Sequence, residues 1–276
     1  MKIGCSLPFK LFTRPAENEA CLALLAGAGG SVARLLEGIR CAGAQSAELR
    51  SVGADADPDD VLNAYEQCRA AGLSVTVHGH MPRGVQSSGA FFLPYHKLFE
   101  VFQNPLNITL HALAEQAQTA EMLDQLATLL KENDYPVLLA LENSRNKSPG
   151  DAANSCENVC NILSLTADKA IGICWDFGHY YYNLTHFTPN AGVVPPDEFL
   201  SKVRHTHIHA VYDEKTHYPL DIGELPLQRY CGALTARGYK GLFNLELEPA
   251  RYYKELDPYR HLISSLEILK EAAAHG

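Results

Sequence analysis

Acidic and histidine side chains recur near the ends of several short aliphatic segments of this chain, among them Glu142, Asp176 and Glu246. Side chains of a strand alternate between two faces, so each segment has one aliphatic face and one face that carries imidazoles or carboxylates. The polar faces are Thr76-His78-His80, Thr109-His111, Ala140-Glu142, Cys174-Asp176, His205-His207-His209 and Asn244-Glu246-Glu248. Carboxylates that share an interior cannot all ionise without a cation, because buried charge without a partner is costly. The pattern therefore predicts a metal site.

Length and composition are typical of one enzyme-sized domain, which we expect to span residues 1–276. Hydrophobic residues make up 46% of the chain, and no apolar run reaches the roughly 18 residues that a membrane span needs. The net charge of −9 argues against a nucleic-acid partner, whose phosphates bind lysine and arginine. The segment Met1–Cys5 leads directly into a candidate strand, which leaves no room for a signal peptide and indicates a cytoplasmic protein. Eight cysteines without a Cys-x-x-Cys pair fit reduced thiols in that compartment.

A strand-then-helix unit repeats along the chain. Candidate strands begin near Lys2, Ser46, Leu73, Asn107, Pro136, Ala170, Arg204 and Lys240. Helical patterns, with apolar residues at three- and four-residue steps, cover Ser31–Cys41, Pro58–Ala71, Pro94–Phe102, Glu115–Asn133, Asp151–Leu165, Pro196–Val203, Pro226–Arg237 and Asp257–Ala274. Eight such units predict an α/β fold, a closed (β/α)8 barrel. An open doubly wound sheet is the alternative, but the glycine-rich turn that usually follows its first strand is missing.

Three longer connections, Ser6–Gly30, His179–Pro195 and Val211–Leu225, each follow a strand. In a parallel barrel they lie at the C-terminal mouth, where active sites form. The run Tyr180-Tyr181-Tyr182-Asn183 in the second connection is equally compatible with the wall of a pocket and with a packed loop.

Six motifs, taken in order, resemble one superfamily. They are V-H-G-H (77–80), I-T-L-H-A (108–112), L-A-L-E-N (139–143), G-I-C-W-D-F-G-H (172–179), H-T-H-I-H (205–209) and L-F-N-L-E-L-E-P (242–249). Together they resemble the xylose isomerase-like TIM barrel superfamily, which holds sugar isomerases and epimerases, inosose dehydratases and the endonuclease IV family. The resemblance extends from the first strand to the last helix. It implies a TIM barrel without selecting one reaction.

The resemblance implies that a divalent metal is bound by Glu142, Asp176, His207 and Glu246. Manganese, magnesium, zinc and cobalt all accept such oxygen and imidazole ligands, so the ligand types do not choose among them. His207 is preferred over its neighbour two residues later because it better matches the family's His-x-x-Asp motif, whose last position here is alanine.

A second metal is the alternative that endonuclease IV-like members suggest. His78, His111 and His179 match further ligand positions of those members, in which the counterpart of Glu142 bridges two zinc ions. The same members carry Asp-x-His after strand seven for a third zinc, whereas this chain has His217-Tyr218-Pro219. The departure argues against a third zinc and against phosphodiester cleavage.

The candidates for substrate binding are Glu48, His179, His209 and Glu248. Each has a structural alternative. Glu48 could form an internal ion pair with Arg50, Glu248 could be a solvated acid at the rim, and a histidine on a barrel strand is often only a hydrogen-bonded core residue.

Two enzyme hypotheses from different classes follow. A third hypothesis is a barrel that retains the metal-ligating residues but serves as a binding or regulatory protein. The first is a sugar or polyol isomerase or epimerase in which Glu142 and Glu246 exchange a proton as base and acid through an enediolate. The second is a di-zinc hydrolase of phosphate esters, which His78 and His111 favour and the acidic charge disfavours. We expect a small polyhydroxy substrate as the partner. The sequence leaves open which sugar it is, whether it is phosphorylated, and whether the protein forms a homo-oligomer.

Overall fold

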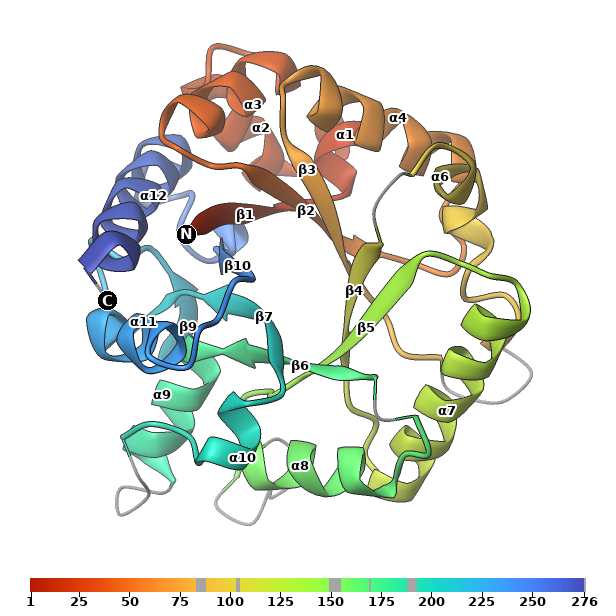
Figure 1. The fold of residues 1–276 in the computed structure, drawn as a ribbon. Helices are drawn as coiled ribbons and strands as arrows, with labels where there is room; N and C mark the ends of the chain where they lie inside the picture. The colour runs from red at the N-terminus through yellow and green to blue at the C-terminus, as the bar shows by residue number, and fades with distance from the viewer. Residues whose placement is uncertain (83–87, 103–104, 149–154, 169, 188–192, 276) are drawn as a thin grey trace.

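Parallel strands close into a barrel in the computed structural model, which describes residues 1–82, 88–102, 105–148, 155–168, 170–187 and 193–275 (Figure 1). The order around the barrel is β1-β10-β7-β6-β5-β4-β3-β2, and β1 closes the ring by pairing with both β10 and β2. The barrel strands are β1 (Lys2–Pro8), β2 (Ser46–Val52), β3 (Ser74–Gly79), β4 (Leu106–His111), β5 (Val137–Glu142), β6 (Gly172–Asp176), β7 (Val203–Ile208) and β10 (Leu242–Leu245). This topology confirms the predicted TIM barrel and excludes the open doubly wound sheet.

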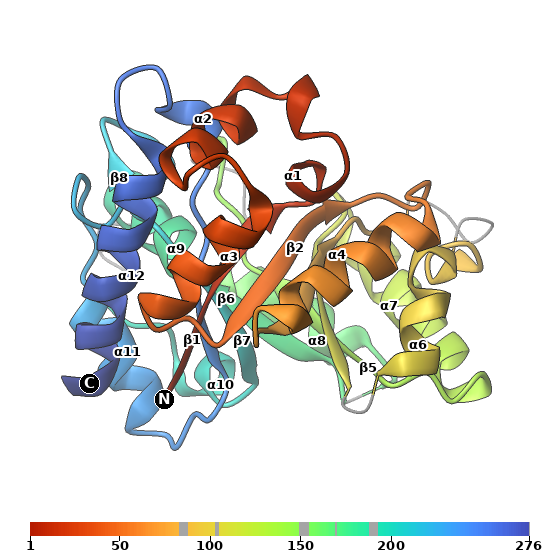
Figure 2. The same ribbon diagram turned by 90° about the horizontal axis from the view of Figure 1, so that it is seen from above.

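Helices form a layer around the barrel (Figures 1 and 2). Polar residues cap several of them: Ser31 accepts the backbone N–H of Arg34 at the start of α3, and Ser155 does the same for Asn158 in α8. The outer helices are α3 (Val32–Cys41), α4 (Pro58–Ala70), α6 (His96–Val101), α7 (Gln116–Glu132), α8 (Cys156–Leu165), α10 (Asp197–Leu200), α11 (Leu227–Thr235) and α12 (Pro258–His275). All eight lie within the predicted helical segments or extend one residue past them, although residues 151–154 of one prediction fall outside the described part of the chain.

The alternation along β6 shows how the strands serve both layers. Ile173 and Trp175 are fully buried, and the Trp175 ring packs against Phe177 and Tyr230 of the surrounding helices. The alternating residues Cys174 and Asp176 belong to the opposite face, which lines the barrel interior. The aliphatic and aromatic face of the strand therefore packs in the core between strands and helices. The polar face carries the candidate site residues into the barrel interior.

The connections at the C-terminal mouth contain more regular structure than the sequence predicts. The expectation of a loop from His179 is wrong for its first part, because helix α9 (Phe177–His186) begins directly after β6. Asp176 is the N-cap of this helix, and its carboxylate accepts the backbone N–H of His179 at 2.6 Å. An aspartate that ends a strand can thus start a helix without an intervening loop.

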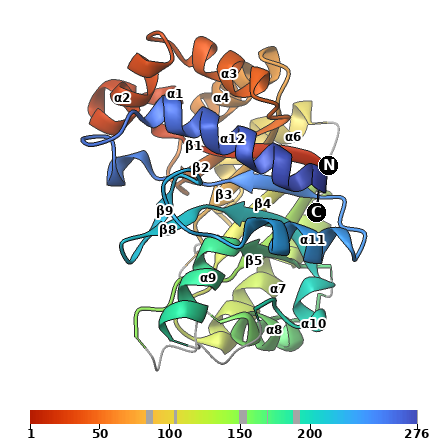
Figure 3. The same cartoon turned by 90° about the vertical axis from the view of Figure 1, so that its left-hand side faces the viewer.

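Two other connections also carry regular elements. Helices α1 (Lys10–Thr13) and α2 (Glu19–Gly27), joined by the short helix η1 (Pro15–Glu17), follow β1. After β7 the chain forms an antiparallel hairpin of β8 (Ala210–Tyr212) and β9 (Lys215–Tyr218). Figure 3 places α1, α2 and the hairpin at the end of the barrel away from the chain termini.

Within the described residues no single helix is long and apolar enough to cross a membrane. The pair α2 and α3, taken together across a bend of 60°, meets the same test of length and composition.

Candidate metal centre

Four strand ends bring the predicted ligands together. Glu142 and Asp176 are the last residues of β5 and β6, His207 lies near the end of β7, and Glu246 follows β10. The parallel register places Asp176 directly opposite His207. All four side chains are buried, and one donor atom from each lies within 4.8 Å of the others. The spacing is that of a ligand set around a single ion.

Buried polar atoms in this cluster lack hydrogen-bond partners among the described residues. They include both carboxylate oxygens of Glu142, Oε2 of Glu246 and Nδ1 of His207. His207 Nδ1 lies 3.3 Å from Glu142 Oε1 and 3.4 Å from Glu246 Oε2, in contacts that lack hydrogen-bond geometry. Leaving such groups unsatisfied costs about 1–3 kcal/mol each, and more when they are charged. A divalent cation would satisfy them together, so the residues present fit a metal.

Charge interactions shift the pKa values of Glu142, Glu246 and His207. Burial alone would raise the pKa of Glu142, but His111, His207 and His78 together hold it well below its usual range. Burial likewise opposes ionisation of Glu246, and His207 with neighbouring histidines holds its pKa well below its usual range. For His207, burial lowers the pKa, but Cys174 and the surrounding glutamates raise it well above its usual value.

His78 and His111 lie beside the cluster as the sequence predicts. His78 bridges the two glutamates, with Nε2 3.3 Å from Glu142 Oε2 and Nδ1 3.2 Å from Glu246 Oε1. His111 Nε2 lies 3.5 Å from Glu142, and its Nδ1 is 2.7 Å from the hydroxyl of Ser144. Because His78, His111 and Glu142 each offer an atom within 4.8 Å of the others, a second ion sharing Glu142 is compatible with the geometry.

His179 belongs to a different donor group from the one that the second-metal hypothesis needs. Its Nδ1 is 3.1 Å from Asp176 Oδ2 and 3.5 Å from Glu142 Oε1. By donor distance it groups with Asp176, His209 and His217, and not with His78 and His111. The predicted trio of histidines is therefore divided between two clusters.

Glu48 lies beneath the ligands, inside the barrel. It is fully buried and accepts hydrogen bonds from Ser6 Oγ at 2.5 Å, His205 Nε2 at 2.9 Å and Asn244 Nδ2 at 3.1 Å. Its Oε1 is also 2.9 Å from His207 Nε2, in an ion-pair contact that lacks hydrogen-bond geometry. Burial opposes ionisation of Glu48, but His207 and His205 lower its pKa. The carboxylate therefore supports His207 from the side opposite to the other ligands.

Two residues predicted to bind substrate have their polar atoms in contact with other protein groups. Glu48 and His209 are both fully buried, with their polar atoms directed at protein groups. Arg50 forms an ion pair with Glu248 and not with Glu48 as suggested, because Arg50 Nη2 lies 3.0 Å from Glu248 Oε2. Glu248 is one-third exposed at the mouth, a place from which it could reach a substrate.

His217 is a site residue that the sequence reasoning missed. It lies on β9, its Nε2 is 3.5 Å from Glu246 Oε2, and it stacks on His209 with ring centroids 4.0 Å apart. Burial and the neighbouring His209 hold its pKa well below the usual value. The sequence carries one signal for it, a histidine after strand seven where the resemblance to endonuclease IV-like members implies Asp-x-His.

Comparison with known proteins agrees with this architecture. A family model described as xylose isomerase-like TIM barrel matches residues 37–271, most of the chain. The chain belongs to this family. Its buried carboxylate and histidine clusters suit the divalent metals that the family typically binds.

Individual similar proteins have low sequence identity to this chain or match less of it than the family model does. D-psicose 3-epimerase from Clostridium cellulolyticum H10, solved with D-tagatose, has a TM-score of 0.68 and 11% identity, with 99% of each chain covered. The protein SMc04130 of Sinorhizobium meliloti 1021 has a TM-score of 0.60 and 14% identity over 90% of this chain and 96% of its own. The uncharacterized protein MJ1188 of Methanocaldococcus jannaschii is 44% identical over 87 residues, 32% of this chain and 29% of its own length. At 11% and 14% identity, the likeness to the two solved structures concerns the fold alone.

Proposed function

We propose that this protein is a metal-dependent isomerase or epimerase of a sugar or polyol. The observation that carries the proposal is the group of buried, unsatisfied donor atoms on Glu142, His207 and Glu246 at the C-terminal mouth. That mouth is where active sites of this fold form. Likeness to an epimerase solved with D-tagatose supports a ketose as the substrate class.

A divalent cation held by Glu142, Asp176, His207 and Glu246 would polarise a carbonyl oxygen and lower the cost of the enediolate. Glu142 and Glu246 extend from β5 and β10, which β6 and β7 separate in the barrel. They therefore approach a bound substrate from different sides. One carboxylate would take the proton from the carbon next to the carbonyl, and the other would return a proton on the opposite side.

Partly exposed groups around the buried cluster would position the substrate hydroxyls. His111 has 41% of its side chain exposed, His217 has 16%, and Glu248 is held by Arg50 at the rim. Hydrogen bonds from such groups would fix the carbon chain so that its reacting C–H faces a glutamate.

A di-zinc hydrolase of phosphate esters is the second candidate. The grouping of His78, His111 and Glu142 favours it, since a second ion could share Glu142 there. The net charge of −9 still argues against a nucleic-acid substrate. Although the chain lacks Asp-x-His after strand seven, His217 reaches the site from β9, with Nε2 3.5 Å from Glu246 Oε2.

The first test is hydrogen exchange at carbon. The metal-loaded protein should incorporate solvent deuterium next to the carbonyl of at least one ketose in a panel. His111→Ala should keep close to one ion per chain and lower turnover modestly, and His96→Ala on the outer helix α6 should change neither. The hydrolase would be favoured if the wild type cleaved a phosphate ester without incorporating deuterium, and if His111→Ala lost both that cleavage and a second ion.

A further inference from the structure

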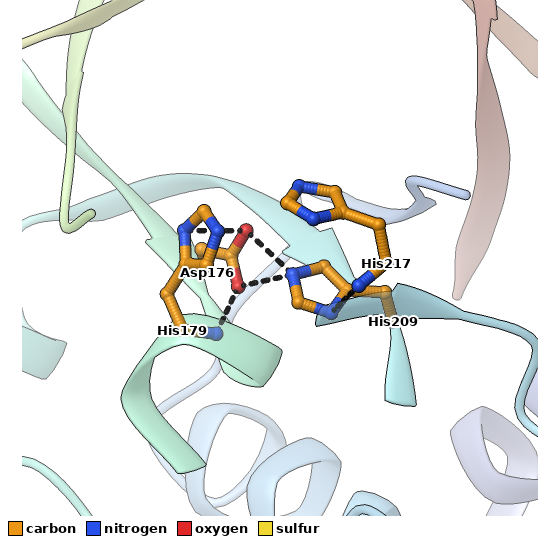
Figure 4. Close-up of side chains that lie close together, drawn as sticks. All are labelled: Asp176, His179, His209 and His217. Atoms are coloured by element: carbon orange, nitrogen blue, oxygen red, sulfur yellow. Dashed lines mark hydrogen bonds and ion pairs between the residues drawn. The ribbon is translucent and has the colours of Figure 1, made fainter. Parts of the chain in front are cut away.

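We propose that His209 is a positioning residue that holds the Asp176 carboxylate and is not itself a metal ligand. The proposal rests on the metal centre proposed above, of which Asp176 is one ligand. By distance alone His209 could bind an ion, because Asp176, His179, His209 and His217 each offer an atom within 4.8 Å of the others (Figure 4). The hydrogen bonds of the ring decide between the two roles.

The backbone of His217 determines which nitrogen of His209 carries the proton. The His217 N–H donates to His209 Nδ1 at 2.9 Å, which is shorter than the 3.3 Å from Nδ1 to the carbonyl oxygen of Ala210, a contact that would need a hydrogen on Nδ1. A backbone amide can only donate, so Nδ1 must present its lone pair. A neutral imidazole with a lone pair on Nδ1 has its hydrogen on Nε2.

That hydrogen faces the aspartate. His209 Nε2 lies 3.1 Å from Asp176 Oδ1 and 3.2 Å from Oδ2, so the ring donates to the carboxylate (Figure 4). A metal ion on Nε2 would require the ring to lose its remaining hydrogen while Nδ1 still accepts the His217 amide. A neutral ring therefore has no lone pair to offer an ion in this position.

The surrounding backbone fixes the ring in place. His217, whose backbone N–H donates to the ring, lies in strand β9 of the hairpin. Its φ of 64° is a left-handed conformation that is uncommon for a residue with a side chain. On the other side, a Cβ at Gly178 would lie 2.1 Å from both Nδ1 and Cε1 of His209. The ring therefore occupies space that only glycine leaves free, and it is fully buried from any substrate.

Asp176 is consequently oriented from two directions. The backbone N–H of His179, in the first turn of α9, donates to Oδ1 at 2.6 Å, and the His209 ring donates from the barrel side. Partners of this kind orient a ligand before the ion arrives, and their loss typically weakens metal binding about 10–100-fold.

Two variants of His209 separate a donor from a ligand. In His209→Gln the amide N–H2 can replace the Nε2 donor, whereas His209→Ala removes it. Titration with Mn2+ should give His209→Gln an affinity within a few-fold of the wild type and His209→Ala one about 10–100-fold weaker, with unchanged stoichiometry. If His209→Gln loses an ion, or binds as weakly as His209→Ala, the ring is a ligand and the proposal is overturned.

The wild-type protein provides a test that does not depend on how the variants fold. Long-range 1H–15N correlation spectra should show a protonated Nε2 and an unprotonated Nδ1 for His209, both without metal and after addition of Zn2+. A proton on Nδ1, or loss of the Nε2 proton on adding zinc, would contradict the positioning role. Absence of any ion binding by the wild type would instead overturn the proposed function. The spectra without metal would still show which ring nitrogen of His209 carries the hydrogen.

Discussion

His207 is the residue around which the candidate site is arranged. One ring nitrogen faces Glu142 and Glu246, and the other faces the buried carboxylate of Glu48 at 2.9 Å. A carboxylate behind a ligating histidine fixes its orientation and raises its basicity. On the opposite side, Asp176 has its own support in His209. Each of these two proposed ligands thus has a neighbouring side chain that orients it.

Glu142→Gln should abolish high-affinity metal binding and turnover together, because it removes a ligand charge and the proposed base at once. We expect metal affinity to fall by more than the roughly 100-fold that loss of an outer partner costs. Turnover should drop about 10²–10⁴-fold even at saturating metal. Calorimetric titration and ketose exchange would measure both effects.

The matched control is Glu66→Gln, the same substitution at an exposed position of α4. It should bind metal and turn over substrate like the wild type. Retention of metal affinity in Glu142→Gln would remove this residue from the ligand set.

The residues of the site differ in how far the sequence could predict them. Glu142, Asp176 and Glu246 were predictable as a group because each ends an aliphatic strand, and strand periodicity alone places them inside a barrel. Their roles stay predictions. The positions of His209 and His217 depend on a hairpin whose backbone turns to a φ of 64°, which no local pattern in the sequence reveals.

At the scale of elements, the junction of α9 with the hairpin β8–β9 completes the site. Helix α9 begins at Asp176 and places Gly178 against the ring of His209, while β9 supplies the amide of His217. The sequence predicts a loop here because the pattern after β6 is dominated by aromatic and polar residues without an obvious apolar stripe. The N-cap contact of Asp176, which starts the helix, serves the site as well.

Gly178→Ala should destabilise the protein by about 1–3 kcal/mol, since the added methyl would overlap the buried ring of His209. Displacing that ring should also weaken metal binding. Urea unfolding and Mn2+ titration would measure the two effects on the same sample.

Gly89→Ala is the appropriate control, because no atom of the described residues lies within 4 Å of the position of its Cβ. Its free energy of unfolding should stay within about 0.5 kcal/mol of the wild type. Equal behaviour of the two variants would mean that His209 can move aside without cost.

For the whole molecule, the closed barrel explains why residues spread from Glu48 to Glu246 meet in one place. Eight strand and helix units could be predicted from periodicity, and closure into a ring followed from their number. TIM barrel interiors are usually filled by branched aliphatic side chains. Here Ser6, Glu48, His205 and Asn244 form a hydrogen-bonded group inside the barrel. The polar interior supports the metal centre from below.

Anomalous diffraction from crystals grown with Mn2+ tests the central claim most directly. We predict one strong peak at the C-terminal mouth, with oxygen or nitrogen atoms of Glu142, Asp176, His207 and Glu246 at about 2.0–2.3 Å. An ion held by His209 in place of His207, or a mouth without an ion at saturating Mn2+, would contradict the account.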